Sequence, residues 1–205
     1  MPSFLNCYQK RTFTMATPRL LFRPLVETDF SAVIELGNKV HGENYLTPEN
    51  LADYYARGQT ESGRNLHWLA FSDGELAGIR LTFAPGKWDI DAYCTPAAWP
   101  FAPEQLCYFK CSAVDYDIQG AGIGRSLLQH SIVEAQGAGC LGGLAHIWRQ
   151  SPNNSAFEYF SRCGGELIAD HGNRWHKASV EDGYYCPVCD GVCYCTAAEM
   201  LLRFA

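Results

Sequence analysis

The sequence contains no run of about 18 apolar residues, the approximate length that a helix needs to cross a membrane. Residues 1–11 also lack the apolar segment of a secretory signal. We therefore expect no membrane-spanning segment and a cytoplasmic, reducing location. Met15 would make an alternative start, and residues 1–17 are expected to form an N-terminal tail.

Positive charge is also scarce. Sixteen Lys and Arg residues stand against 22 Asp and Glu residues, which gives a formal net charge of −6. This balance provides no basic field for nucleic acid or for an anionic membrane surface. We therefore expect neither a nucleic-acid partner nor a membrane partner. A basic or neutral small molecule is more compatible with the charge.

Signs of disorder are missing as well. Hydrophobic residues make up 47% of the chain and charged residues 19%, which is ordinary for a globular core. The sequence shows no internal repeat and no low-complexity segment. A length of 205 residues fits one domain, which we expect over residues 18–205.

The most informative stretch is residues 114–124, Val-Asp-Tyr-Asp-Ile-Gln-Gly-Ala-Gly-Ile-Gly. It follows a strand-like run and leads into an amphipathic helical pattern, so its uncovered backbone amides and the helix dipole predict an anion site for a phosphate or pyrophosphate. The spacing excludes two common phosphate binders. The first glycine of a P-loop would fall on Gln119 and its lysine on Arg125, and the third glycine of a dinucleotide site would also fall on Arg125.

The order Gln-x-x-Gly-x-Gly over residues 119–124 resembles the acyl-CoA pyrophosphate loop of the GNAT superfamily of N-acetyltransferases. Residues 153–165, Asn-Asn-Ser-Ala-Phe-Glu-Tyr-Phe-Ser-Arg-Cys-Gly-Gly, resemble that family's other signature, Asn-x-x-Ala-x-x-Phe-Tyr-x-x-x-Gly-Gly. One departure matters. The family's tyrosine, often the acid that protonates the leaving thiolate, falls on Phe160, and the tyrosine here is Tyr159.

The resemblance implies an α/β (α+β) fold with a mixed, mostly antiparallel central sheet flanked by helices, and acetyl-CoA as co-substrate. In the family, backbone amides of the glycine turn hold the pyrophosphate, the preceding strand supplies an oxyanion donor, and the asparagine and its helix face the pantetheine arm. The cofactor-binding residues implied here are Ala113, Val114, Gln119, Gly120, Ala121, Gly122, Ile123, Gly124, Arg125, Asn153 and Phe160.

Hydrophobic periodicity and turn signals predict an element order that agrees with this family. The expected strands are residues 19–26, 66–72, 75–83, 107–114, 141–147, 165–169 and 198–204, and the expected helices are residues 29–40, 48–57, 122–136 and 154–163. Two inserts stand outside this order. Residues 85–106 form an aromatic loop, either an Ω-loop packed on its own side chains or a substrate wall, and residues 170–196 form a Cys-rich insert.

The expected reaction is direct transfer of an acetyl group to an amine of a small molecule or peptide, without a covalent cysteine intermediate. The strand over residues 107–114 carries no carboxylate to act as base. The catalytic candidates are therefore His146, which can equally be a hydrogen-bonded structural residue, and Tyr159, which needs a rotated helix to replace the absent tyrosine. Weaker candidates are His67, Asp89 and Asp91.

Two other function classes stay open, an acyl-CoA-binding sensor with little catalysis and a metal-binding interaction module. The metal candidates are Cys186, Cys189, Cys193 and Cys195, whose spacing suits a structural zinc ion. Alternatives are two disulfides, free thiols, an iron–sulfur cluster, or a Cys₃His site with His171 or His176. The other cysteines are expected to be small buried hydrophobes. The oligomeric state is open, with a homodimer as one alternative.

Overall fold

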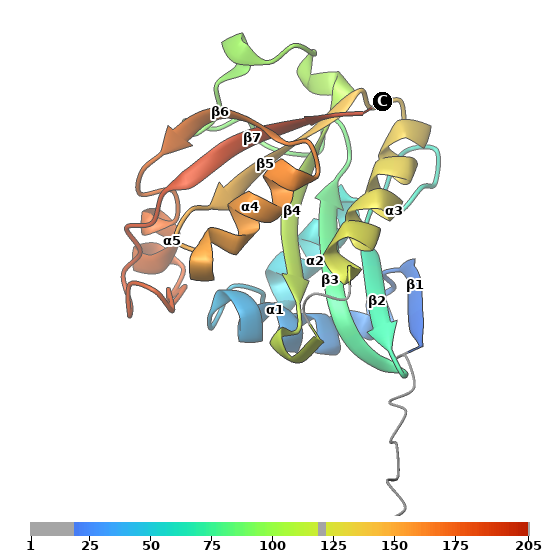
Figure 1. Cartoon of the computed structure of the whole chain (residues 1–205), viewed down its shortest axis with the longest axis horizontal. Coiled ribbons are helices and arrows are strands. Elements are labelled where there is room, and N and C mark those ends of the chain that lie inside the picture. Colours follow the sequence, from blue (N-terminus) through green and yellow to red (C-terminus); the bar gives the residue numbers. More distant parts are fainter. Residues whose placement is uncertain (1–18, 119–121, 205) are drawn as a thin grey trace, which may run out of the picture.

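The computed structural model describes residues 19–118 and 122–204, so the expected tail over residues 1–17 lies outside the described residues. Within them, a seven-stranded sheet carries helices on both faces (Figure 1). The strands are β1 (Leu20–Pro24), β2 (Trp68–Ser72), β3 (Glu75–Phe83), β4 (Leu106–Val114), β5 (Gly142–Trp148), β6 (Glu166–His171) and β7 (Ala197–Arg203). The helices are α1 (Phe30–His41), α2 (Pro48–Arg57), α3 (Ile123–Gly137), α4 (Ser155–Arg162) and α5 (His176–Glu181). This arrangement confirms the fold expected from the sequence.

The strand order is β1-β2-β3-β4-β5-β7-β6, and all neighbouring pairs are antiparallel except β4 and β5. The parallel pair is short. In the described part of the chain it joins only residues 106–108 to residues 142–144. Beyond that point β4 stays paired with β3 up to Val114, and β5 stays paired with β7 up to Trp148. The two central strands therefore diverge toward their C-terminal ends.

A bulge in β4 coincides with the divergence. Leu81 pairs with Cys111, whereas the next residue, Thr82, pairs with Phe109, so Lys110 is an extra residue in β4. A bulge of this kind bends its strand and increases the local twist. The bend therefore falls in the stretch of β4 that has left β5.

Local signals explain where elements begin and turn. The Thr47 Oγ1 accepts a hydrogen bond from the Asn50 N–H at 3.3 Å, the Asn50 side chain accepts one from the Thr47 N–H at 2.9 Å, and Pro48 occupies the first helical position of α2. Asp73 and Gly74 both have positive φ, of 51° and 95°, as the tight β2–β3 turn requires. No helix within residues 19–118 or 122–204 is both long and apolar enough to span a membrane.

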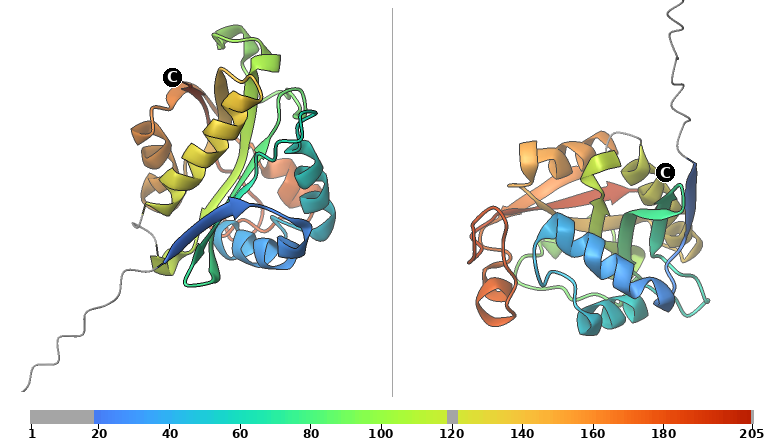
Figure 2. Two further views of the ribbon diagram at one scale, coloured as in Figure 1. Left: turned by 90° about the vertical axis from the view of Figure 1, so that its right-hand side faces the viewer. Right: turned by 90° about the horizontal axis from the view of Figure 1, so that it is seen from below.

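Helices α1 and α2 cover one face of the sheet, and α3 and α4 cover the other (Figure 2). Close approach of α3 depends on Gly78 in β3, because an added Cβ there would lie 2.9 Å from Ile123 and 3.0 Å from Leu127. On the α1–α2 face, residues 85–105 cover the other half of the sheet, with Trp99 only 8% exposed.

Helix α5 is the element that the sequence did not predict. It is six residues long and buries none of them, so it lacks the apolar stripe by which a helix is recognised. It lies within the Cys-rich insert and is tied to the cysteine cluster, because the Ser179 Oγ accepts a hydrogen bond from the Cys193 N–H at 2.8 Å. Tertiary contact, not periodicity, holds this helix.

Candidate active site and candidate metal centre

The N-terminus of α3 follows β4 after eight residues and lies close to the end of that strand, because a Cβ added at Gly124 would lie 3.7 Å from Val114 Cγ2. Gly122 is the N-cap residue, with a φ of 78°, and no described atom lies within 4 Å of the position that a Cβ would occupy there. A glycine cap brings no side chain to cover the first amides of α3, so these donors and the helix dipole suit an anion. Ile123 is buried, and Arg125 is exposed. Gln119, Gly120 and Ala121 lie outside the described residues.

The predicted oxyanion donors end the same strand. Ala113 is 1% exposed and pairs with Ile79 of β3, and Val114 pairs with Gly78. Both residues lie beyond the point at which β4 leaves β5. The structure therefore brings the end of β4 and the start of α3 together beside the divergence.

Helix α4 presents Tyr159, not Phe160, to α3. The Tyr159 hydroxyl donates a hydrogen bond to the Gly124 carbonyl oxygen at 2.8 Å. Phe160 is fully buried and packs edge-to-face on Phe109, with ring centroids 6.0 Å apart. Its contact with a cofactor stays a prediction. Asn153, with a φ of 56°, lies in the turn that leads into α4.

Arg80 of β3 lies beside Tyr159 and was not predicted. Its side chain is 2% exposed and stacks on the Phe109 ring, 4.4 Å from the centroid. Nε and Nη2 are buried without a hydrogen-bond partner among the described residues. Burial lowers the pKa of this guanidinium and raises the pKa of Tyr159 to about 12, although the guanidinium opposes the second shift. The sequence signal that could have identified Arg80 was a charged residue in the middle of the largely apolar strand β3.

His146 lies on the opposite face, in a network that residues distant in sequence complete. Its Nε2 lies 2.5 Å from the Tyr93 carbonyl oxygen, and its Nδ1 lies 2.9 Å from the Tyr108 hydroxyl. A carbonyl can only accept, so Nε2 carries the proton, and the neutral Nδ1 accepts from Tyr108. Burial lowers the pKa of His146 to about 4, which keeps the ring neutral at pH 7.

Glu199 of β7 anchors a second part of this network. Its carboxylate is fully buried and accepts hydrogen bonds from the Thr95 N–H at 2.9 Å and from the Trp99 Nε1 at 2.7 Å. The His171 Nε2 lies 2.9 Å from the other oxygen, and the His171 ring lies 5.8 Å from that of His146. Burial would raise the pKa of Glu199, but these hydrogen bonds outweigh it and lower the pKa. Sequence reasoning missed Tyr108 and Glu199 because no motif links them.

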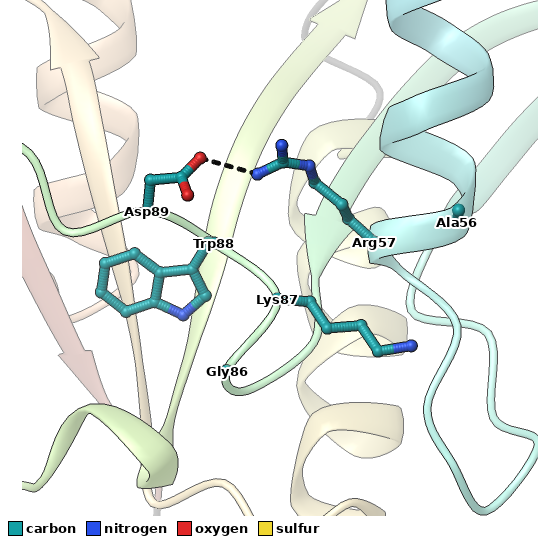
Figure 3. Close-up of a pocket in the computed structure, with 6 residues that line it drawn as sticks. All are labelled: Ala56, Arg57, Gly86, Lys87, Trp88 and Asp89. Carbon is teal, nitrogen blue, oxygen red and sulfur yellow. Dashed lines mark hydrogen bonds and ion pairs between the residues drawn. The ribbon is translucent and has the colours of Figure 1, made fainter.

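The aromatic loop, residues 85–105, covers the His146 network. The Trp88 ring stacks on the Tyr108 ring, with centroids 5.3 Å apart and an interplanar angle of 22°. The same tryptophan borders a hollow of about 410 Å³ between α2 and the loop (Figure 3). Its lining residues are Ala56, Arg57, Gly86, Lys87, Trp88 and Asp89. Arg57 and Asp89 form an ion pair of 2.8 Å across this hollow.

The weaker base candidates are occupied elsewhere. Asp89 is 83% exposed beside Arg57, and Asp91 pairs with Arg174 at 2.9 Å. His67 is fully buried, with its Nδ1 accepting from the Thr82 N–H at 3.1 Å. None of the three bonds to His146, so the structure leaves His146 at the centre of the polar network.

The four clustered cysteines bring their sulfur atoms together. All four Sγ atoms lie within 4.8 Å of one another, and Cys195 lies 3.8 Å from Cys186 and 3.6 Å from Cys189. Four sulfurs at about 2.3 Å around a tetrahedral ion would be about 3.8 Å apart, whereas a disulfide needs about 2.05 Å. The Tyr194 N–H lies 3.4 Å from the Cys189 Sγ. The geometry fits a tetrahedral metal ion, and His171 is bonded to Glu199 instead.

Comparison with known proteins places the fold. No match was found among curated protein sequences. Among solved structures, the ribosomal-protein-S18-alanine N-acetyltransferase of Escherichia coli is similar, with 19% identity, a TM-score of 0.63, and coverage of 91% of this chain and 95% of that one. The structure of yncA from Salmonella typhimurium with its cofactor acetyl-CoA is also similar. It has 19% identity, a TM-score of 0.61, and coverage of 91% of this chain and 94% of that one.

A third similar structure is Arabidopsis thaliana Naa50 in complex with the bisubstrate analogue CoA-Ac-MVNAL, with 16% identity, a TM-score of 0.60, and coverage of 90% and 99%. At these identities the likeness shows the fold alone. The family model described as the acetyltransferase (GNAT) family matches residues 31–165, which is more than half of the chain. The chain therefore belongs to the GNAT family of acetyltransferases.

Proposed function

We propose that the protein transfers an acetyl group from acetyl-CoA directly to an amine of a small molecule or a peptide. The observation that carries this proposal is the position of the glycine-capped start of α3, directly beyond the divergence of β4 and β5 and across the sheet from the His146 network. The anion site would then bind the cofactor on one face of the sheet, and the proton-accepting network would lie on the other face, with the divergence of β4 and β5 between them.

Binding of the cofactor would depend on backbone groups. The amides of residues 119–124 would hold the pyrophosphate, and the exposed Arg125 would add a charge-assisted contact. The Asn153 turn and α4 would face the pantetheine arm, and the backbone of Ala113 and Val114 would supply an oxyanion donor. Acetyl-CoA supplies the thioester carbonyl that the amine attacks.

Removal of the amine proton is assigned to Tyr108 and His146. The Tyr108 hydroxyl passes its proton to the His146 Nδ1 while its oxygen accepts the proton of the attacking amine. The Nε2–H stays on the Tyr93 carbonyl throughout. At pH 7 the ring is neutral and its Nδ1 can accept, because burial lowers the pKa of His146 to about 4; the same low pKa makes this nitrogen a weak proton acceptor.

No cysteine intermediate is needed. Burial raises the pKa of Cys111 to about 11, so at pH 7 this residue is a thiol and a poor nucleophile. Tyr159 also keeps its proton at pH 7 and would act as the acid only after leaving the Gly124 carbonyl. Every group in this scheme comes from one chain, so a homodimer is not required.

The Cys-rich insert is proposed to hold a structural zinc ion on Cys186, Cys189, Cys193 and Cys195. The sulfur spacing supports it, and a cytoplasmic, reducing location would keep the thiols free of disulfides. Elemental analysis of protein purified without added metal tests the idea. Less than about 0.2 zinc per chain would reject it, and about one iron per chain would replace zinc with iron.

The decisive experiment measures thiol release from acetyl-CoA by the purified protein over a panel of amines, together with calorimetric binding of acetyl-CoA. Gly122→Asp should abolish both, because it adds a side chain and a negative charge where the pyrophosphate binds. Gly139→Asp is the matched control, since Gly139 also has a positive φ, of 87°, and described surroundings open to a Cβ. Binding without thiol release for any amine would favour the sensor alternative.

A further inference from the structure

The knuckle (residues 183–196) packs against the end of α1 and the following turn, residues 41–47, called here the α1–α2 turn (Figure 2). Three hydrogen bonds of 3.2 Å join the two segments, from the Tyr184 hydroxyl to the His41 carbonyl, from the Tyr185 N–H to the Glu43 carbonyl, and from the Asn44 Nδ2 to the Gly183 carbonyl. The Tyr45 and Tyr184 rings also meet edge-to-face, with centroids 6.2 Å apart. The contact is therefore made by backbone and side chains together.

The α1–α2 turn contacts β4, and the knuckle contacts the end of β5. On the β4 side, the buried side chain of His41 lies against the backbone of Ser112. On the β5 side, Trp148 packs on the buried thiols of the knuckle, and the Arg149 N–H donates to the Thr196 carbonyl at 3.0 Å. Their contact thus bridges the region in which β4 and β5 no longer pair.

The knuckle has little of its own to keep it ordered. Its large apolar side chains point outward, with Val188 49%, Val192 41% and Tyr194 64% exposed. The fully buried members at its centre are the thiols of Cys186 and Cys193. A segment without an apolar core of its own needs a metal or a crosslink to hold its shape.

We propose that metal binding by the four cysteines locks the knuckle onto the α1–α2 turn, so that the metal acts as a clasp between the two halves of the sheet. Cys186 directly follows Tyr184 and Tyr185, so a metal that fixes this thiol also fixes both contact residues.

Gly42 provides a way to open the clasp without touching a metal ligand. It has a φ of 109°, and an added Cβ would lie 2.3 Å from the Tyr185 carbonyl oxygen and 2.9 Å from Pro187. Gly42→Ala therefore forces the two segments apart. Gly63→Ala is the matched control, because Gly63 has a φ of 79° and no described atom within 4 Å of its added Cβ. Both variants place a Cβ at a positive φ, but Gly42, with a ψ of 161°, lies in a region essentially confined to glycine, so Gly42→Ala adds backbone strain at the same contact as the clash.

The first test is hydrogen exchange of the full-length protein, before and after removal of its metal by a chelator and after addition of Zn²⁺. Removal should speed exchange of the Tyr185 amide and of residues 41–47 by about tenfold or more, while α3 is unchanged and Zn²⁺ restores the slow rate. A chain that binds neither zinc nor iron, or equal exchange with and without metal, overturns the proposal.

If metal removal speeds exchange throughout the protein, the variants Gly42→Ala and Gly63→Ala provide the test. Gly42→Ala should retain its metal and still exchange faster by about tenfold at residues 41–47 and at Tyr185, whereas Gly63→Ala should match the parent. Equal exchange in Gly42→Ala and Gly63→Ala contradicts the clasp. Neither readout requires acetyltransferase activity, so failure of the proposed function leaves this result intact.

Discussion

Two buried charges lie on opposite faces of the sheet, and their surroundings differ. Glu199, under the aromatic loop, accepts hydrogen bonds from Thr95, Trp99 and His171. Arg80, under α4, has a stacking contact with Phe109, but its Nε and Nη2 have no hydrogen-bond partner among the described residues. Both oxygens of the Glu199 carboxylate accept hydrogen bonds, whereas two of the three guanidinium nitrogens of Arg80 have no partner among the described residues.

The difference shows which charge stabilises its surroundings. Hydrogen bonds to a charged group contribute about 1.5–3 kcal/mol each, so Glu199 holds the loop and β6 together. A buried charge whose hydrogen bonds are incomplete is destabilising by up to several kcal/mol, and a cation–π contact of about 0.5–2 kcal/mol offsets only part of this. Burial of the Arg80 charge therefore destabilises the folded protein next to Tyr159, in the candidate active site.

Removing the paired charge should have the largest effect. Glu199→Ala should lower the free energy of unfolding by about 3–5 kcal/mol, because the donors of Thr95 and Trp99 and the His171 ring lose their acceptor. Urea unfolding at pH 7 measures this change. Glu199→Gln, which keeps an acceptor oxygen, is the control and should lose less. A loss below about 1 kcal/mol in the alanine variant would mean that water replaces the carboxylate.

Acidification should lower the free energy of unfolding, because a buried histidine such as His67 must stay neutral in the folded protein. The contacts of His67 require a neutral ring, and burial lowers its pKa from 6.5 to about 4. Its stabilisation is complete above pH 6.5 and is lost as the pH falls toward 4, because only the unfolded chain takes up the proton in that window. The loss is about 3 kcal/mol. Urea midpoints over this range measure it, and His67→Gln should flatten the profile.

Removing the incompletely paired charge of Arg80 should have the opposite sign. Arg80→Met should raise the free energy of unfolding by about 1–3 kcal/mol, because an apolar chain fills the same space without a buried charge. Arg80→Lys keeps the charge, loses the stacking, and should not stabilise. A destabilised Arg80→Met variant would show that stacking on Phe109 outweighs desolvation.

The smallest expected effect is that of the hydroxyl beside Arg80. Tyr159→Phe should lower the free energy of unfolding by about 0.5–1.5 kcal/mol, since it removes the hydrogen bond to the Gly124 carbonyl together with the contacts of the hydroxyl with Arg80 and Cys163. Thermal unfolding measures this loss, and turnover of the same variant tests the proposed acid. Unchanged turnover would remove Tyr159 from the catalytic candidates.

The face with α3 and α4 could be largely predicted from the sequence, and the other face could not. The glycine turn and the segment before α4 are contiguous signatures, and hydrophobic period and turn residues located the strands and the first four helices. The His146 network joins Tyr93, Tyr108 and His146, which meet only after the loop folds over the sheet. No local pattern signals such a meeting, and Arg80 is exceptional only once its burial is known.

The short parallel ladder between β4 and β5 also has a kinetic consequence. Strands β1 to β4 pair in an unbroken antiparallel series, apart from the long connection that holds α1 and α2, and β5, β6 and β7 form a second antiparallel group. Contacts between partners close in sequence form early, whereas the parallel pair must wait for the α3 crossover. We therefore expect the seam between β4 and β5 to form last during folding and to open first in the native state, before either group of strands melts.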